Sequence, residues 1–163
     1  MTSRVDCHIR YDPEVDVALL SFVKSSSISG GPALEFDDQT GLAGLVRLGA
    51  EGEFDHLELL GAKRAVPRLL SKLRTPPPGV RDYCRGVVEV WMAGPEEQGA
   101  VRFDLDDTAT RGDEYEVSVR VESSSSTVAT LMYDGDSGVL RSLTLFPSGN
   151  LLRDFIENHV VGG

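Results

Sequence analysis

The segment Phe103-Asp104-Leu105-Asp106-Asp107-Thr108 comes closest to a catalytic pattern in this chain. An aspartate that attacks phosphorus, a second aspartate two residues later that donates a proton, and Mg²⁺ between them would carry out phosphoryl transfer. Such a site is built at the C-terminal end of a buried parallel strand that is followed by a helical crossover. Here the strand alternates with Arg102 and more β pattern follows. We therefore interpret the segment as a solvated strand end and an acidic turn.

Two other groups of residues could be considered as metal sites, and neither has the required spacing. Asp134-Gly135-Asp136-Ser137-Gly138 begins like a calcium loop, but Leu145 stands where a bidentate glutamate is needed. Asp and Gly favour tight turns, so we interpret this segment as a hairpin turn. His8, His56 and His159 fall on different predicted elements. We expect no metal site and no cofactor.

The charge balance restricts the partners of the protein. Lys and Arg number 16 and Asp and Glu 26, which gives a net charge of −10. Nucleic acids and anionic membranes bind surfaces with surplus cations, so neither is an expected partner. We find no apolar signal segment and no run of about 18 apolar residues that could cross a membrane. Two cysteines do not make a disulfide framework. We therefore expect a cytoplasmic protein.

Alternation of apolar and polar residues with a period of two dominates the chain and predicts strands. In the first half, apolar residues then recur with helical spacing between Val66 and Leu73, which predicts one helix. The prolines of Thr75–Gly79 end this helix. The first-half strands are predicted at Val5–Tyr11, Val15–Val23, Ala33–Asp37, Ala43–Leu48 and Phe54–Leu60.

The same order of elements returns in the second half. A shift of 86 residues places Leu57 on Leu143 and Leu59 on Leu145, which favours an internal duplication over a chance alignment. We predict one domain over 1–163, built of repeats 4–74 and 86–160 with a linker at 75–85. The predicted fold class is α+β, a mostly antiparallel β-sheet or sandwich of two five-strands-plus-helix halves. The second-half strands are predicted at Val87–Met92, Ala100–Leu105, Tyr115–Val121, Val128–Tyr133 and Val139–Phe146, with a helical stripe over 151–159.

Two phrases of the first half carry a family resemblance. They are Tyr11-Asp12-Pro13-Glu14-Val15-Asp16-Val17-Ala18-Leu19 and His56-Leu57-Glu58-Leu59-Leu60-Gly61-Ala62. They resemble the Tyr-Asp-x-Glu-x-Asp-x-Leu hairpin and the Ile-Glu-Ile-Leu-x-Ala phrase of an uncharacterised family, the domain of unknown function 2283. The match covers roughly residues 5–70, and the second half lacks both phrases. The resemblance implies a small β-rich module with a helix, and it implies no activity.

Several predicted strands, among them Val15–Val23 and Val87–Met92, are apolar on both faces. One face can pack on a helix, and the other must meet a second sheet, a second subunit or a ligand. Aromatic and methionine side chains suit an apolar pocket with a few polar tips. They would serve equally as a sandwich core or as the interface of a homodimer. The candidate pocket residues are Tyr11, Phe22, Trp91, Met92, Met132 and Tyr133.

Two functions stay open at this point. The first is a small-molecule-binding β-rich protein, which as an enzyme would be a cofactor-free cyclase or isomerase acting on an apolar biosynthetic intermediate. The alternative is an acidic protein-interaction module, similar to an immunity protein or antitoxin, that masks a basic partner. A closed apolar cavity of about 300 Å³ or more would favour the first function. A contiguous acidic face would favour the second.

Overall fold

The computed structural model describes residues 2–22, 29–49, 54–73, 84–94, 99–106, 113–120 and 127–146. Ten strands and two short helices make up these residues. The first-half elements are β1 (Thr2–Asp12), β2 (Val17–Ser21), β3 (Ser29–Asp38), β4 (Gly41–Gly49), β5 (Phe54–Leu60), α1 (Ala62–Ala65) and α2 (Pro67–Ser71). The second-half elements are β6 (Cys84–Ala93), β7 (Val101–Asp104), β8 (Glu114–Arg120), β9 (Thr127–Asp134) and β10 (Leu140–Leu145).

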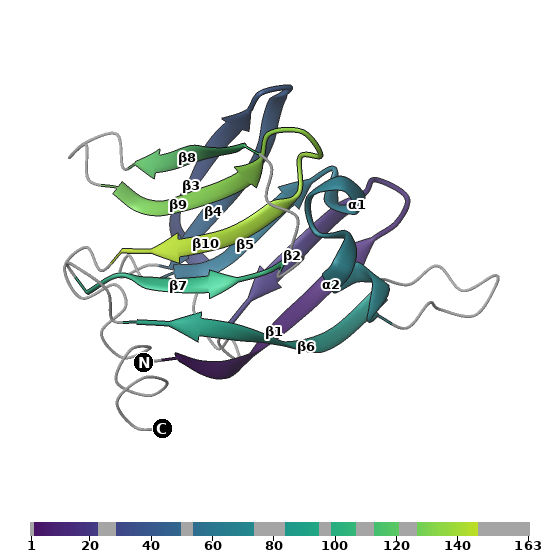
Figure 1. Ribbon diagram of the computed structural model, residues 1–163, viewed down its shortest axis with the longest axis horizontal. Helices are drawn as coiled ribbons and strands as arrows, with labels where there is room; N and C mark the ends of the chain where they lie inside the picture. The colour runs from purple at the N-terminus through teal and green to yellow at the C-terminus, as the bar shows by residue number, and fades with distance from the viewer. Residues whose placement is uncertain are drawn as a thin grey trace.

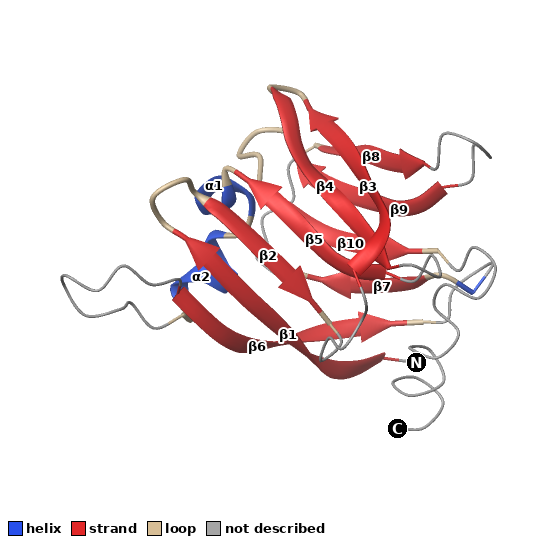
Figure 2. Ribbon diagram, turned by 180° about the vertical axis from the view of Figure 1, so that it is seen from behind, coloured by secondary structure: helices blue, strands red, loops and turns tan. Residues whose placement is uncertain are grey.

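All ten strands form one antiparallel sheet in the order β3-β4-β5-β2-β1-β6-β7-β10-β9-β8. The sheet curves so far that its two edge strands, β3 and β8, come into contact. The second-half strands lie toward the viewer in Figure 1, and β2 to β5 lie toward the viewer from behind in Figure 2. The prediction of a mostly antiparallel β protein is confirmed, and the sheet is nearly closed, which leaves little exposed edge.

The helix predicted between Val66 and Leu73 is observed as two pieces that meet at Val66. Val66 has φ −133° and ψ 54°, outside the helical region. Pro67 follows it, and a proline disfavours the helical conformation of the residue before it. Pro67 itself starts α2, where its missing N–H costs nothing. The helical stripe predicted over 151–159 lies outside the described residues.

The two halves share one strand order, since β3-β4-β5-β2-β1 is matched by β8-β9-β10-β7-β6. Their pairing registers also correspond. Adding 83 to both numbers of the β1–β2 pair His8↔Ser21 gives the β6–β7 pair Trp91↔Asp104. Across β2 and β5, adding 83 to Ala18 and 86 to Leu59 gives the observed pair of Val101 with Leu145. The same backbone arrangement is therefore built twice along the chain.

The inward side chains of both halves form a single hydrophobic core. Phe22 at the end of β2 stacks on Phe103 of β7, with ring centroids 3.9 Å apart. Cys84 is also buried, at the start of β6. We had predicted it in the linker 75–85, but β1 continues to pair with β6 as far as Tyr11↔Cys84. Residues 74–83 of that linker lie outside the described part of the chain.

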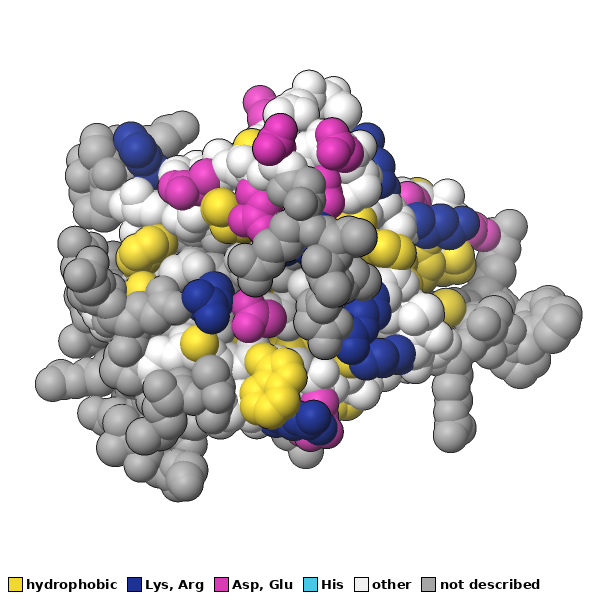
Figure 3. Space-filling model, viewed as in Figure 1, with side chains coloured by type: hydrophobic (Ala, Val, Ile, Leu, Met, Phe, Trp, Pro, Cys, Tyr) yellow, Lys and Arg dark blue, Asp and Glu magenta, His cyan; other side chains and the backbone are white. Residues whose placement is uncertain are grey.

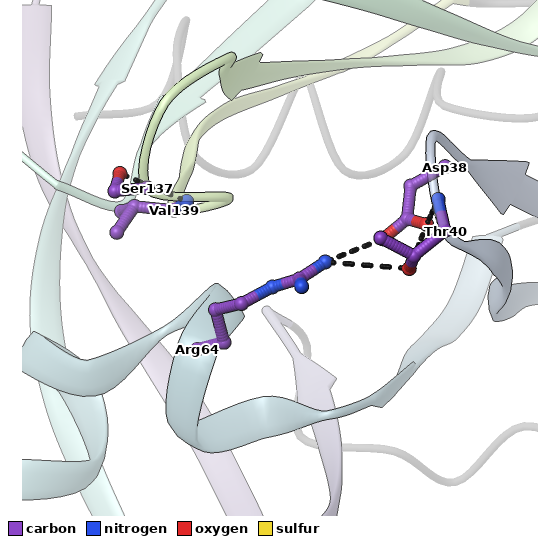
Figure 4. A network of polar contacts seen from close by, with 5 residues as sticks. All are labelled: Asp38, Thr40, Arg64, Ser137 and Val139. Carbon is purple, nitrogen blue, oxygen red and sulfur yellow. Dashed lines mark hydrogen bonds and ion pairs between the residues drawn. The ribbon is translucent and has the colours of Figure 1, made fainter.

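Arg64 of α1 lies where the edges of the two halves meet. Its guanidinium donates hydrogen bonds to the Asp38 carboxylate at 3.2 Å and to the Thr40 hydroxyl at 3.4 Å (Figure 4). On its other side is the β9–β10 turn, where a Cβ added to Gly138 would lie 2.6 Å from Arg64 Nε. Nearby, burial and the Asp38 carboxylate raise the pKa of Tyr133. Arg64 thus bridges a first-half turn and a second-half turn.

Asp16 connects the β1–β2 hairpin to α1. Its backbone has φ 55°, a left-handed conformation that Asp tolerates better than most residues. The carboxylate accepts hydrogen bonds from the Tyr11 hydroxyl at 2.8 Å and from the Lys63 N–H at 2.9 Å. The Asp16 carbonyl accepts a third from the Ala62 N–H at 3.1 Å. The two phrases that carry the family resemblance therefore meet at this aspartate.

The Tyr11–Asp16 contact makes stability depend on alkaline pH. Burial and the Asp16 hydrogen bond raise the pKa of Tyr11 from its ordinary value of 10.0 to about 12. Between these values the folded protein keeps a proton that the unfolded chain has lost, so the free energy of unfolding falls as pH rises. We expect Tyr11→Phe to lose about 0.5–1.5 kcal/mol of stability at neutral pH, and its stability to decline less between pH 10 and 12.

Urea unfolding of both proteins at pH 7, 10 and 11.5 measures the difference. Burial also raises the pKa of the Cys7 thiol to about 12, which adds to the decline in both proteins equally. The comparison between them therefore isolates Tyr11. Equal losses of stability in wild type and Tyr11→Phe would contradict the assignment.

Candidate functional site

A β-bulge in β5 places two consecutive polar side chains in contact. In the β4–β5 pairing, Arg47 lies opposite His56 and Leu48 opposite Phe54, which leaves Asp55 as the extra residue. The Asp55 Oδ2 atom lies 2.9 Å from His56 Nδ1. Neighbouring residues of a regular strand point to opposite faces, so this contact depends on the bulge. The two side chains are partly buried, with 22% of His56 and 13% of Asp55 exposed.

Cationic side chains lie beside this pair on the outer face of the sheet. In the β1–β6 pairing Arg10 lies directly opposite Arg85, and both are exposed. One step along β1, His8 lies opposite Val87 of β6 and opposite Ser21 of β2. The Ser21 hydroxyl donates to the Asp55 carbonyl at 3.2 Å, which connects β2 to the bulge.

These side chains border an open groove of about 650 Å³. It crosses the outer face of β1, β2 and β5, the strands toward the viewer in Figure 2, and reaches β6. Two arginines, two histidines and one carboxylate line it, so its charge is opposite in sign to the net charge of −10. The lining residues are His8, Ile9, Arg10, Leu19, Ser21, Asp55, His56, Arg85, Gly86 and Val87.

The second half contains the same bulge with different chemistry. In the β9–β10 pairing the register shifts between Leu140 and Ser142, so Arg141 is the extra residue there. Arg141 is buried, and its guanidinium donates to the Asp134 carboxylate at 2.8 Å. Hydrogen bonds from the Asp136 N–H and from Arg141 hold the pKa of Asp134 below its usual value. This bulge residue stabilises a turn, whereas Asp55 contacts a histidine at the edge of a groove.

The six predicted pocket residues are divided between the two faces of the sheet. Four are buried in the core. Among them, the Tyr133 ring stacks on Tyr115 with centroids 5.3 Å apart. Met132 is half-buried, and Trp91 is 41% exposed on the outer face. The four buried side chains are Tyr11, Phe22, Met92 and Tyr133.

A second groove, of about 410 Å³, lies between α2 and β6 and β7. Trp91 borders it, and the Arg4 guanidinium stacks over the indole ring at 4.7 Å. Figure 3 shows an exposed hydrophobic patch low on this face with basic and acidic side chains around it. Arg4 also pairs with Glu89 at 3.7 Å. The cation therefore has both an aromatic and an acidic neighbour, and this groove is less distinctly cationic than the first.

Sequence reasoning missed the first groove. It treated His8 and His56 as unrelated because they fall on different strands, and it left Arg10 and Arg85 unremarked. The consecutive Asp55 and His56 were the one local signal, but only the bulge brings their side chains together. Among the described residues, no group of three or more His, Cys, Asp or Glu side chains is placed to hold a metal ion.

Comparisons with known proteins give no assignment: no family model, no curated protein and no solved structure matches this chain. The described helices, α1 and α2, are both too short to cross a membrane. The argument for a function therefore depends on the geometry of the groove.

The outward position of Trp91 can be measured directly, because it is the single tryptophan of the chain. We expect native fluorescence emission close in wavelength to that of the urea-unfolded chain, and strong quenching by acrylamide. Arg4→Ala should remove a cation–π contact worth about 0.5–1 kcal/mol and increase quenching further. Native emission that is strongly blue-shifted and protected from acrylamide would contradict this placement.

Proposed function

We propose that this protein binds a small organic anion in the groove over β1, β2, β5 and β6. The observation that carries the proposal is the pairing of Arg10 with Arg85, directly opposite each other beside two histidines. Like charges at opposite positions of an antiparallel pair destabilise the sheet. An anion bound between the two guanidinium groups would offset that repulsion. Guanidinium groups also suit carboxylates, which they can bind through two parallel hydrogen bonds.

The apolar lining of the groove suggests the rest of the ligand. Leu19 lies opposite Arg10 on β2, and Val87 of β6 is 55% exposed. A ligand with an anionic head and a short apolar body would cover both side chains while its head contacts the arginines. This keeps the sequence-based proposal of an apolar small molecule and adds an acidic group to it. The position moves from the interior, where the predicted aromatic residues form a packed core, to the outer face.

Binding of 3-phenylpropionate tests the proposal, with its uncharged amide as the matched ligand. We expect the acid to bind with a dissociation constant in the micromolar to millimolar range and the amide to bind at least tenfold more weakly. Arg85→Ala should weaken binding of the acid at least tenfold, because it removes half of the guanidinium pair. Isothermal titration calorimetry at two salt concentrations measures both effects, and higher salt should reduce the affinity.

Arg120→Ala is the matched control, because it removes an exposed arginine of β8, outside the groove. Its affinity for the acid should equal that of wild type. Equal binding of acid and amide, or equal loss in Arg85→Ala and Arg120→Ala, would overturn the proposed site.

An acidic interaction module is the second candidate, and the homodimer prediction belongs with it. Trp91 and Val87 are large exposed apolar side chains on the same outward face of β6. Exposed apolar groups of this kind suit a partner surface, and the net charge of −10 would attract a basic partner, as masked by an immunity protein or antitoxin.

Light scattering after size-exclusion chromatography tests the homodimer. We expect twice the chain mass of 17.7 kDa for wild type and a single chain mass for Val87→Arg, which places a charge in the contact. A wild-type mass of one chain at all concentrations would exclude the homodimer.

The finer features of the fold and location are proposals of the same standing. We propose that the two halves are repeats of one ancestral five-strands-plus-helix unit, and their shared strand order and registers support this. We also propose a cytoplasmic location. Cys7 and Cys84 are both free thiols, which is typical of proteins in reducing compartments.

A further inference from the structure

We propose that His56, positioned by Asp55, catalyses proton transfer at the carbon next to the carbonyl of a 2-oxo acid bound in this groove. The inference deepens the proposed function: it depends on the anion site and adds a reaction to it. Arg10 and Arg85 would hold the carboxylate, and His56 would act on the neighbouring carbon. The reaction is a keto–enol isomerisation, which needs no cofactor.

The contact between Asp55 and His56 has the geometry of a general base. With Nδ1 donating to the carboxylate at 2.9 Å, the ring orientation and tautomer are set, and Nε2 is left as the proton acceptor. The carboxylate also stabilises the imidazolium that forms when Nε2 takes a proton. The partial exposure of His56, 22%, allows a ligand in the groove to reach the ring.

The fold itself does not require a histidine and an aspartate at these positions. The pair of Arg47 with His56 corresponds to that of Met132 with Ser142 in the second half, where Arg141 is the bulge residue. There the bulge forms with an arginine paired to Asp134. The same backbone is thus stable without an imidazole on its outer face. The Asp55–His56 pair is therefore an added feature of one half.

The width of the groove suits a small 2-oxo acid. Neighbouring strands lie about 4.8 Å apart, so β1 and β5, with β2 between them, are separated by about 10 Å. Arginine side chains from β1 and β6 and an imidazole from β5 can both lean over Ser21 and Leu19 of β2. A carboxylate on the arginines then leaves the third carbon of the acid within reach of Nε2.

The step balances without an oxidant, a reductant or a metal ion. The C3–H bond breaks and its proton forms an N–H bond at His56 Nε2. The electron pair of the C–H bond becomes the C2–C3 double bond, and the carbonyl electrons move to oxygen to give the enolate. The guanidinium groups and His8 supply positive charge where this oxygen becomes negative. Return of the proton to oxygen gives the enol, and return to carbon regenerates the ketone.

The charge around His56 comes from several elements. Two carboxylates, Asp55 and Glu58 on β5, favour the imidazolium, and the surrounding cations favour the neutral ring. The titratable and charged groups on the surrounding strands are Asp55 and Glu58 of β5, Arg47 of β4, His8 and Arg10 of β1, and Arg85 of β6.

Hydrogen–deuterium exchange into 2-oxo-4-phenylbutyrate tests the reaction. In deuterated buffer, NMR follows loss of the two C3 proton signals. We expect the wild-type protein to accelerate this loss at least a hundredfold over buffer, and His56→Gln to return it to the buffer rate, since general-base catalysis typically contributes 10²- to 10⁴-fold. Ser142→Ala, at the corresponding second-half position, is the matched control and should keep the wild-type rate.

Asp55→Asn tests the positioning role separately. We expect at least a tenfold lower exchange rate and a midpoint of the pH–rate profile at lower pH, because an imidazolium without its carboxylate neighbour loses its proton more readily. A structural role alone would lower the rate without moving the profile. Circular dichroism and urea unfolding of each variant identify any that fail to fold.

Calorimetric binding of the same oxo acid separates the two proposals. His56→Gln should still bind it, because the arginines remain. Binding by wild type without accelerated exchange would overturn this inference and leave the proposed function standing. Failure of wild type to bind would overturn both. Accelerated exchange that survives in His56→Gln would assign the base to another residue and overturn the role of His56.

Discussion

The pairing of β1 with β6 is the interaction on which the rest of the structure depends. It runs through ten consecutive residue pairs, from Thr2↔Ala93 to Tyr11↔Cys84, and joins the two halves into one sheet. The inward side chains of both strands enter the common core. The outward ones bring Arg10 beside Arg85 and His8 beside Val87. A shift of one residue would send every one of these side chains to the opposite face, so core and groove are specified by the same register.

The bulge shows how one backbone device can serve stability in one half and chemistry in the other. Where Arg141 is the extra residue, it is buried and pairs with Asp134, which holds the β9–β10 turn. Where Asp55 is the extra residue, it contacts His56 beside a groove that carries two arginines. Duplication of a module allows such a division, because one copy can keep its stabilising contacts while the other changes.

The two conserved-looking phrases of the family resemblance acquire a physical explanation in the fold. Tyr11 and Asp16 from the first phrase, and Ala62 from the second, meet in a set of hydrogen bonds that fixes α1 against the β1–β2 hairpin. No family model matches the chain. These contacts belong to the architecture and lie apart from the proposed site, so the resemblance and the function rest on different residues.

The sequence by itself determined the class of fold and the alternation of its strands. Period-two patterning is a local property, so it correctly indicated a mostly antiparallel β protein and placed Trp91 and Met92 of β6 on opposite faces. The corresponding leucines of β5 and β10 were also aligned correctly at a shift of 86, because both hairpins use similar turns and spacing. The position of Cys84 was wrong, since the extent of β6 is set by its partner β1.

The site was decided only by the tertiary structure. Arg10 and Arg85 are far apart in the chain and become neighbours through strand pairing, which the sequence of either strand does not specify. Asp55 and His56 are adjacent in sequence, but a regular strand would turn them to opposite faces and only the bulge lets them touch. Net charge misled in the same way: a value of −10 is a sum over the whole chain, and it conceals a cationic groove because charge acts locally. The aromatic residues that suggested an interior pocket instead fill the core, since a nearly closed sheet brings the inward faces of both halves together.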